Sequence, residues 1–342
     1  MTDILTVEDL KAYYLMNYFG VNREVRAVDG ISMSIARNEI YGIAGESSSG
    51  KTSLIKVLAA ATRPPLKIVG GSALYHFKSG DIDIAKASER ELEAIRWRNL
   101  SYIMQGSMSV LNPLRKVGRI FEDFAARPLG LSGGAFRQRV VEHLERLKLS
   151  PQLLNAYPHE LSGGMRQRVT IGLATVCNPE FIIADEPTTA LDVVVQKDVL
   201  SLVKRLQTEF GSSIVFVTHD MAVHASIADR VGIIYAGRLV EEAPTRTLFA
   251  APKHPYTAHL VASLPRIGDT GQRPALEGRP PSLANPPAGC RFHPRCPLAL
   301  DKCKTEVPQL ELVAPGQRSA CWRWADVRPI VPAPAKVAEA VR

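Results

Sequence analysis

The sequence predicts an α/β fold with parallel strands, followed by a loop-rich appendage. An apolar strand, a Gly/Ser loop and a helix follow one another over Glu39 to Ala61. Further along, the apolar runs FIIADE and SIVFVTHD flank a helical pattern from Val194 to Phe210, an arrangement typical of a parallel βαβ unit. Prolines cluster after about residue 247, which favours irregular structure there.

The composition fits a globular protein with room for two domains. The chain has 342 residues, of which 46% are hydrophobic and 22% charged. The 42 Lys and Arg residues exceed the 34 Asp and Glu residues, giving a net charge of +8. This excess could indicate nucleic acid, an anionic membrane surface or a solvated basic surface, and no polybasic run decides between them.

No segment is expected to span a membrane, because the apolar runs are strand-sized and far short of about 20 residues. The N-terminal segment MTDILTVEDLKAYY does not resemble a signal peptide. We therefore expect a cytosolic chain whose five cysteines are thiols or metal ligands rather than disulfides.

Between these landmarks the pattern changes twice. Residues 66 to 100 are mixed, with a strand-like piece at Ala73 to Phe77 and a charged helix from Ser88 to Trp97. From about Gln105 to Pro158 the periodicity is helical. The final residues, PIVPAPAKVAEAVR, are expected to form a mobile tail.

The Gly/Ser loop has the composition of a phosphate-binding loop. It fits G-x-x-x-x-G-K-[ST], and its candidate nucleotide contacts are Gly45, Ser47, Ser48, Ser49, Gly50, Lys51 and Thr52. The glycines let backbone N–H groups curl around phosphates at the start of the following helix. Lys51 is expected to reach the β- and γ-phosphates, and Thr52 to ligate Mg²⁺.

Two carboxylates follow the apolar run of FIIADE. Asp185 is expected at the carboxyl end of a strand, where ligands bind in open α/β sheets. Glu186 is placed to polarise an attacking water. The alternative, that both residues merely cap a strand, is disfavoured by the phosphate loop upstream.

The order of the motifs over residues 4 to 245 resembles the nucleotide-binding subunits of ABC transporters. Gln105 in SYIMQGS resembles the Q-loop, ALD ending at Asp192 resembles the D-loop, and His219 in VTHD resembles the switch histidine. The resemblance implies a P-loop NTPase with a RecA-like core, an antiparallel β subdomain and an inserted helical subdomain. We expect a nucleotide-binding domain over 1–247, its helical subdomain over about 106–160, and an accessory region over 248–342.

The tetrapeptide LSGG occurs twice, and spacing separates the two copies. Ser162 stands 23 residues before Asp185 and Ser132 stands 53 before it. Because the family's signature lies a short, fixed distance before that aspartate, LSGGMRQR at Leu161 to Met165 resembles the functional copy. The copy at Leu131 to Gly134 is interpreted as a loop and helix cap.

The resemblance also assigns roles to residues outside the loop. Glu186 and His219 would handle the attacking water, with Gln105 touching both Mg²⁺ and water and Asp185 acting as a second metal ligand. From the opposite ATPase subunit, Ser162, Gly163 and Gly164 would face the γ-phosphate, with Asp192 near the same nucleotide. Tyr14 aligns with an aromatic that stacks on adenine, although a plain core role is the open alternative.

One residue of the phosphate loop departs from the family pattern. Relatives usually read GESGSGK, and this chain has Ser48 where they have glycine. A serine is costly there if the position needs a positive φ.

Four of the five cysteines lie close together near the C-terminus. Cys290, Cys296, Cys303 and Cys321 have the spacing C-x5-C-x6-C-x17-C. Four thiolates could hold zinc or an iron–sulfur cluster, and gaps wider than typical zinc pairs favour iron–sulfur. Unligated thiols are the alternative, and Cys177 is expected to be a small core residue.

With KHPYTAHLVASLP upstream, the cysteine segment resembles the C-terminal region of the oligopeptide, dipeptide and nickel importer ATPases. That resemblance implies a [4Fe–4S] cluster, with zinc as the alternative. Its role is expected to be a structural staple rather than a redox sensor.

The resemblance implies the ATP-hydrolysing subunit of an ABC importer for oligopeptides or dipeptides. Nickel and oligosaccharides are alternative cargoes. Implied partners are a second ATPase, homologous or identical, two membrane permeases and an extracytoplasmic binding protein, with no nucleic acid. The subunit would lie peripherally on the cytoplasmic face of the inner membrane.

Other classes fit the sequence less well. ABC-type ATPases that act on ribosomes usually carry two cassettes, and this chain has one phosphate loop. Those that act on DNA usually carry a long coiled coil, and no sustained heptad run is present. A binding module without hydrolysis is disfavoured because Glu186 and His219 are both present.

Overall fold

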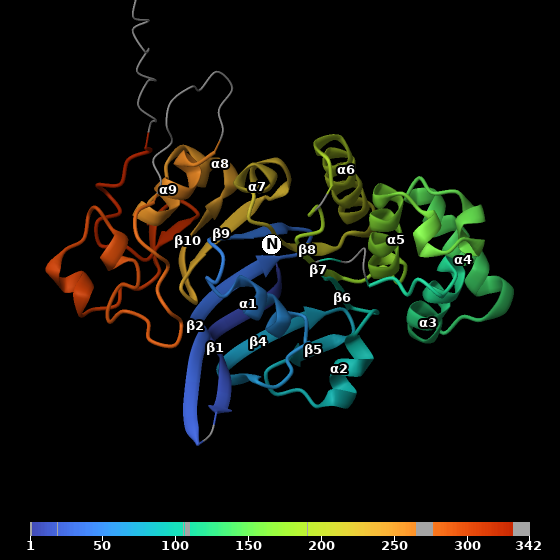
Figure 1. The fold of residues 1–342 in the computed structure, drawn as a ribbon, viewed down its shortest axis with the longest axis horizontal. Coiled ribbons are helices and arrows are strands. Elements are labelled where there is room, and N and C mark those ends of the chain that lie inside the picture. The colour runs from blue at the N-terminus through green and yellow to red at the C-terminus, as the bar shows by residue number, and fades with distance from the viewer. Residues whose placement is uncertain are drawn as a thin grey trace, which may run out of the picture.

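The computed structural model describes residues 2–18, 20–104, 106, 110–189, 191–264 and 276–330. It contains two β-sheets with helices around them, and α1 (Lys51–Leu58) lies where the sheets meet (Figure 1). Gln105 and nearly all of the expected C-terminal tail lie outside the described residues.

The larger sheet carries the predicted parallel strands. Its order is β11-β12-β10-β9-β3-β8-β7-β6, and β3 pairs in parallel with both β8 and β9. Every residue of β3, β7 and β8 is buried, which explains their unbroken apolar runs. The strands are β3 (Ile40–Ala44), β6 (Leu100–Ile103), β7 (Phe181–Asp185), β8 (Ser213–Val217), β9 (Arg230–Tyr235), β10 (Arg238–Pro244), β11 (Glu311–Ala314) and β12 (Gln317–Ser319).

The smaller sheet is antiparallel, as the family resemblance implied. Its order is β2-β1-β4-β5, with β1 (Asp3–Tyr18), β2 (Val21–Ala36), β4 (Leu66–Phe77) and β5 (Gly80–Asp83). Its apolar face shares one core with α1 and the parallel strands. The charged helix α2 (Glu89–Ile95) follows, and Ser88 and Glu91 cap its N-terminus reciprocally.

The helical part of the chain forms a separate lobe beside the sheet (Figure 1). It contains α3 (Val117–Leu129), α4 (Gly133–Arg146), the short 3₁₀ segments η2 (Pro151–Asn155) and η3 (Pro158–Glu160), and α5 (Gly163–Thr175). The helix predicted after the first LSGG is confirmed, because Phe136, Val140, Leu144 and Leu147 are buried on one side of α4 and its end. Two helices, α6 (Val193–Phe210) and α7 (Met221–Ile227), return the chain to the large sheet.

The C-terminal region packs against the opposite side of the sheet from the helical lobe (Figure 1). It contains α8 (Thr245–Ala250), α9 (Pro255–Ala262), η4 (His293–Arg295) and η5 (Asp301–Lys304) with long irregular connections. The core there includes Tyr235, Tyr256 and Phe292. Strand β12 pairs with β10, so the region extends the large sheet. The domain boundary at residue 247 stays a prediction.

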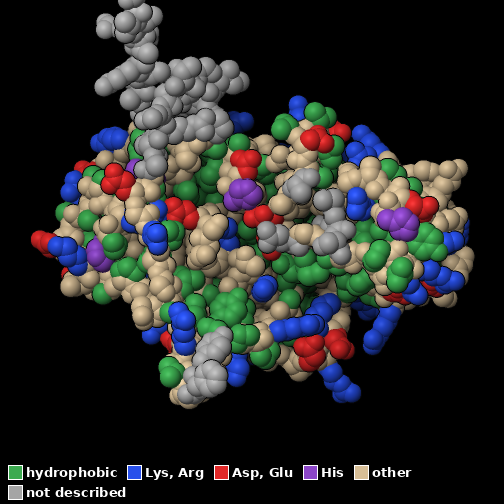
Figure 2. Space-filling model, in the orientation of Figure 1, with side chains coloured by type: hydrophobic (Ala, Val, Ile, Leu, Met, Phe, Trp, Pro, Cys, Tyr) green, Lys and Arg blue, Asp and Glu red, His purple; other side chains and the backbone are tan. Residues whose placement is uncertain are grey.

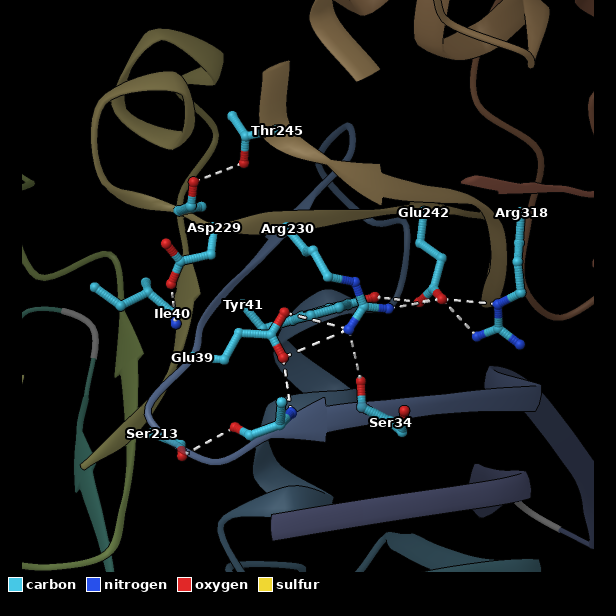
Figure 3. Close-up of polar contacts among 12 residues, drawn as sticks. Ser34, Glu39, Ile40, Tyr41, Ser213, Asp229, Arg230, Glu242, Thr245 and Arg318 are labelled. Carbon is cyan, nitrogen blue, oxygen red and sulfur yellow. Dashed lines mark hydrogen bonds and ion pairs between the residues drawn. The ribbon is translucent and has the colours of Figure 1, made fainter. Parts of the chain in front are cut away.

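A buried polar network ties the C-terminal region to the sheet (Figure 3). Glu242 on β10 accepts from Arg230 at 2.9 Å, from Arg318 on β12 at 2.7 Å and from the Tyr41 hydroxyl at 2.8 Å. Arg230 also bonds Glu39 at 3.2 Å. Three donors thus satisfy the buried Glu242 carboxylate, as a carboxylate removed from water requires.

None of the helices in the described part of the chain has the length and apolar character needed to cross a bilayer. On the face shown in Figure 2, the Lys and Arg side chains are spread over all lobes rather than gathered in one patch. The basic excess of the sequence is therefore not concentrated on this face.

Candidate functional site

Two glycines shape the loop between β3 and α1. Gly45 has φ 152° and Gly50 has φ 103°. A Cβ atom on Gly45 would lie 2.2 Å from the Ile234 carbonyl oxygen, and one on Gly50 would lie 2.1 Å from the Ala27 carbonyl oxygen. Any side chain would clash with fixed backbone at both positions, so this loop path requires glycine.

Ser48 meets the condition under which its departure from the family pattern is costly. Its φ is +63°, in the left-handed region that costs a residue with a Cβ about 1–2 kcal/mol. Ser47, Ser48 and Thr52 are exposed, whereas Ser49 and Lys51 are buried. Of the residues expected to contact phosphate or Mg²⁺, Ser47, Ser48 and Thr52 are thus open to solvent and Ser49 and Lys51 are not.

Lys51 lies folded against the loop. Its Nζ donates to the carbonyl oxygens of Gly45 at 2.6 Å and Glu46 at 2.8 Å. Burial lowers the pKa of Lys51, and the charges of Glu186 and Asp185 oppose that shift. The ammonium group and both predicted carboxylates therefore belong to one electrostatic cluster.

Asp185 ends β7 and is only 2% exposed. Burial raises its pKa, while a 3.1 Å hydrogen bond from the Tyr102 hydroxyl and the charge of Lys51 oppose the shift. A bound cation would compensate this desolvated carboxylate. Tyr102 was not singled out from the sequence, although its place on the strand next to β7 could have indicated it.

Glu186 and His219 meet although 33 residues separate them, with His219 Nδ1 3.2 Å from Glu186 Oε1. Glu186 also has a positive φ of 47°, and its N–H donates to Val217 on β8 at 2.8 Å. The Thr189 hydroxyl donates to its other oxygen at 2.9 Å. A carboxylate held between a hydroxyl and a solvent-exposed imidazole has the geometry of a general base with an orienting partner.

The two LSGG copies have different surroundings. Ser162 caps α5 by accepting from Met165 N at 3.3 Å, and a Cβ on Gly164 would lie 3.1 Å from Val195 of α6. In the first copy, Ser132 precedes α4 without a side-chain cap bond. Around Gly133 and Gly134 a Cβ would meet nothing within 4 Å. Only the second copy adjoins the helix that follows the carboxylates.

Two further predicted residues have defined positions. Asp192 caps α6 by accepting from Val194 N and Val195 N at 3.0 and 2.9 Å. The Tyr14 hydroxyl lies 3.1 Å from Ser53 Oγ on α1, and its ring packs against the core. Its expected contact with adenine stays a prediction, as does the role of Gln105.

The four C-terminal cysteines border one small pocket, with a volume of about 10 Å³. Within the residues that the structure describes, no three His, Cys, Asp or Glu side chains meet as a metal site. Burial raises the pKa of Cys290, that of Cys296 to about 11 and that of Cys321 to about 12. Four thiols are a donor set that metal centres of the zinc or iron–sulfur kind use. Cys177 packs against the core as expected.

Comparisons with known proteins identify the family of the chain. A family model described as "ABC transporter" matches residues 28–189, and one described as "Oligopeptide/dipeptide transporter, C-terminal region" matches residues 240–303. The chain is 40% identical to the dipeptide transport ATP-binding protein DppD of Caldanaerobacter subterraneus subsp. tengcongensis over 333 residues, covering 96% of this chain and 100% of that protein.

Two further similarities are informative. The chain is 39% identical over 330 residues to the oligopeptide transport ATP-binding protein AppD of Bacillus subtilis (strain 168), covering 95% of this chain and 98% of that protein. Among solved structures, the ATP-binding cassette MJ0796, described as a dimeric post-hydrolysis state bound to ADP and Pi, matches with a TM-score of 0.59. It is 27% identical and covers 71% of this chain and 99% of its own.

A glycine-shaped phosphate loop, a buried aspartate and a glutamate–histidine pair define an ATPase cassette of the P-loop class. More particularly, the chain belongs to the ATP-binding subunits of ABC transporters, in the group that carries the oligopeptide/dipeptide transporter C-terminal region. It is an ATPase subunit of that family.

Proposed function

We propose that this chain powers an ABC importer of oligopeptides or dipeptides. The observation that carries the proposal is the Glu186–His219 pair beside the phosphate loop, in a chain whose C-terminal region matches the peptide transporter family. Relatives similar over nearly their whole length are named for dipeptide and oligopeptide transport. Nickel and oligosaccharides are the competing cargoes.

Each residue of the site has a role in hydrolysis. The loop N–H groups and Lys51 would bind the phosphates. Thr52, Asp185 and Gln105 would hold Mg²⁺, which would neutralise phosphate charge. Glu186 accepts the proton of the attacking water through its free electron pairs, and the Thr189 hydroxyl holds its carboxylate in place. His219, bonded to Glu186, keeps that carboxylate aimed at the water and contacts the γ-phosphate.

The remaining contacts come from a second ATPase subunit. The exposed start of α5, with Ser162, Gly163 and Gly164, offers a hydroxyl and free N–H groups to the γ-phosphate of the opposite subunit. Asp192 lies at the adjoining start of α6. The pair would act on two permeases at the cytoplasmic face of the inner membrane, supplied by an extracytoplasmic binding protein.

For the cysteines we propose a [4Fe–4S] cluster held by Cys290, Cys296, Cys303 and Cys321. Support comes from four thiols around one pocket and from the chemistry of thiolate ligands. The bound group would act as a structural cross-link. The test is the iron, sulfide and zinc content of protein purified without oxygen, with Cys296→Ser expected to lose the metal and Cys177→Ser to keep it.

Purification from native membranes in mild detergent tests the transport proposal. Co-purification of two permeases, a second ATPase and a binding protein is expected, and the ligand of the binding protein identifies the cargo. A bound sugar or nickel ion would replace the peptide assignment. Ribosomes or DNA without permeases would contradict the transport function while leaving the ATPase intact.

A further inference from the structure

The C-terminal region reaches the phosphate loop directly. Arg295, in the segment HPRC, donates from Nη1 to Glu46 Oε2 at 2.8 Å and from Nη2 to Glu46 Oε1 at 3.1 Å. The two residues are 249 positions apart in the sequence. The Arg295 side chain is 6% exposed and that of Glu46 24%, so this bidentate pair is largely shielded from water.

A second residue of the same region holds the backbone of Glu46. The Tyr256 hydroxyl, from the HPYT motif, accepts from Glu46 N at 2.7 Å, and Tyr256 is fully buried. Tyr235 of β9 lies between the two contacts, because its hydroxyl accepts from Arg295 at 3.2 Å and its ring packs 4.6 Å from Tyr256. The C-terminal region thus fixes both the side chain and the N–H of one loop residue.

Glu46 is the second residue of the phosphate loop. Its carbonyl oxygen is also held, but by Lys51 rather than by the C-terminal region. That carbonyl accepts from Lys51 at 2.8 Å. When Lys51 turns toward a nucleotide, this bond is given up, and the contacts to Arg295 and Tyr256 remain to hold the loop. Both contacts are supplied by the C-terminal region rather than by the cassette core.

The ion pair between Arg295 and Glu46 also neutralises the charge of the Glu46 carboxylate. A free carboxylate in this loop would repel a polyphosphate, and repulsion between charges is strong where water is excluded. The guanidinium of Arg295 neutralises it through two hydrogen bonds. The pair with Arg295 thus offsets the repulsion between Glu46 and a bound polyphosphate.

We propose that Arg295 and Tyr256 are positioning residues for nucleotide binding, and that the C-terminal region is thereby a structural part of the ATP site. The pair acts on affinity rather than on the chemical step, because neither residue contacts Glu186 or His219 in the hydrogen bonds described. The inference rests on the ATPase activity of the family and not on the identity of the cargo.

The test compares nucleotide affinity and kinetics of single and double variants. Arg295→Gln is expected to raise the Kd and KM for ATP about tenfold with kcat at saturating ATP nearly unchanged. Arg295→Lys should recover part of the lost ATP affinity, because lysine restores the positive charge but not the bidentate geometry of the guanidinium. Combining Arg295→Gln with Glu46→Gln should also recover part of it, because the unpaired carboxylate is gone.

Two further variants provide a control and an independent test. Lys304→Gln removes one positive charge from an exposed position of the same region and is expected to bind ATP like the parent chain. Tyr256→Phe keeps the ring in the core and removes only the acceptor for Glu46 N–H, so it tests the proposal even if Arg295→Gln fails to fold. Its Kd should rise severalfold. Parental affinity in folded Tyr256→Phe, or in folded Arg295→Gln, would overturn the proposal.

Discussion

Ser48 adopts a left-handed conformation in the middle of the phosphate loop, with φ +63°. Glycine tolerates this conformation without a clash. We expect Ser48→Gly to raise the free energy of unfolding by up to about 1 kcal/mol. Ser47→Gly is the matched control, because Ser47 is exposed and lacks a positive φ, so its change should lower stability by about 0.5–1 kcal/mol. Denaturant unfolding of both variants measures the difference. An equal loss of stability in the two variants would show that the Ser48 backbone is not strained.

Glu186 and His219 illustrate what local motifs can and cannot predict. The sequence indicated both residues and their cooperation, and the structure brings them within 3.2 Å. The hydroxyl of Thr189 on Glu186 and that of Tyr102 on Asp185 were missed. Tyr102 comes from another strand, and such a contact depends on sheet register rather than on any nearby pattern.

The assignment of Glu186 as general base predicts a specific defect. Glu186→Gln should reduce hydrolysis at least about 100-fold, while the Kd for ATP stays near the parental value because the phosphate loop is unchanged. Phosphate release and equilibrium nucleotide binding measure the two quantities. Glu209→Gln, at a half-exposed position of α6, serves as control. A Glu186→Gln enzyme that hydrolyses ATP at the parental rate would exclude the assignment.

At the scale of single elements, the two LSGG helices show how context decides the role of a short motif. Both were expected to begin helices, and both do, at Gly133 and Gly163. Spacing to Asp185 distinguished them in the sequence. In the structure, Gln167 of α5 bonds the Pro187 carbonyl beside the carboxylates, which favours the second copy, and its role stays a prediction. Figure 1 shows α4 on the outer side of the helical lobe.

The first turn of α9 depends on a buried neutral histidine. His254 Nδ1 accepts from Tyr256 N at 3.1 Å, and burial lowers the pKa of His254 to about 3. Burial also lowers the pKa of His143 to about 3 and that of His224 to about 4. Below the unfolded pKa of about 6.5, these histidines bind protons in the unfolded chain but stay neutral in the folded chain. Each such histidine therefore costs about 1.4 kcal/mol of stability per pH unit as the pH falls.

His254→Asn tests this at one element. Asparagine can also cap a helix, and it does not titrate, so the loss of stability between pH 6.5 and 4 should become shallower by about 1.4 kcal/mol per pH unit. Urea unfolding across that range gives the slope. His159→Asn, at an exposed position, should leave the slope unchanged. An unaltered slope in His254→Asn would show that His254 does not carry the effect.

Across the whole molecule, the proline-rich region is part of the large sheet rather than an appendage to it. Sequence pattern predicted its irregularity correctly, because prolines and short apolar runs report local conformation. It gave no sign that β12 pairs with β10 or that Arg295 reaches Glu46. Those contacts join residues far apart in the chain, which a local pattern cannot report.

A chain cut after residue 247 tests this integration. The cassette MJ0796 matches 71% of this chain over 99% of its own, so a cassette can fold without such a region. Here, however, Glu241 on β10 is buried and accepts from Lys253 N, His254 N and Gln317 Nε2 at 2.7 to 2.8 Å. Removing these partners leaves a carboxylate and an open strand edge.

We expect the 1–247 fragment to be less stable by several kcal/mol and prone to aggregate. Any folded fraction should bind ATP more weakly, because Glu46 loses its contacts with Arg295 and Tyr256. Thermal unfolding, light scattering and nucleotide titration measure the three effects. A chain ending at residue 330 keeps every contact described here and is the control. If the fragment instead folds, stays monodisperse and binds ATP like the full chain, residue 247 is a true domain boundary, and the C-terminal region supports neither the sheet nor the phosphate loop.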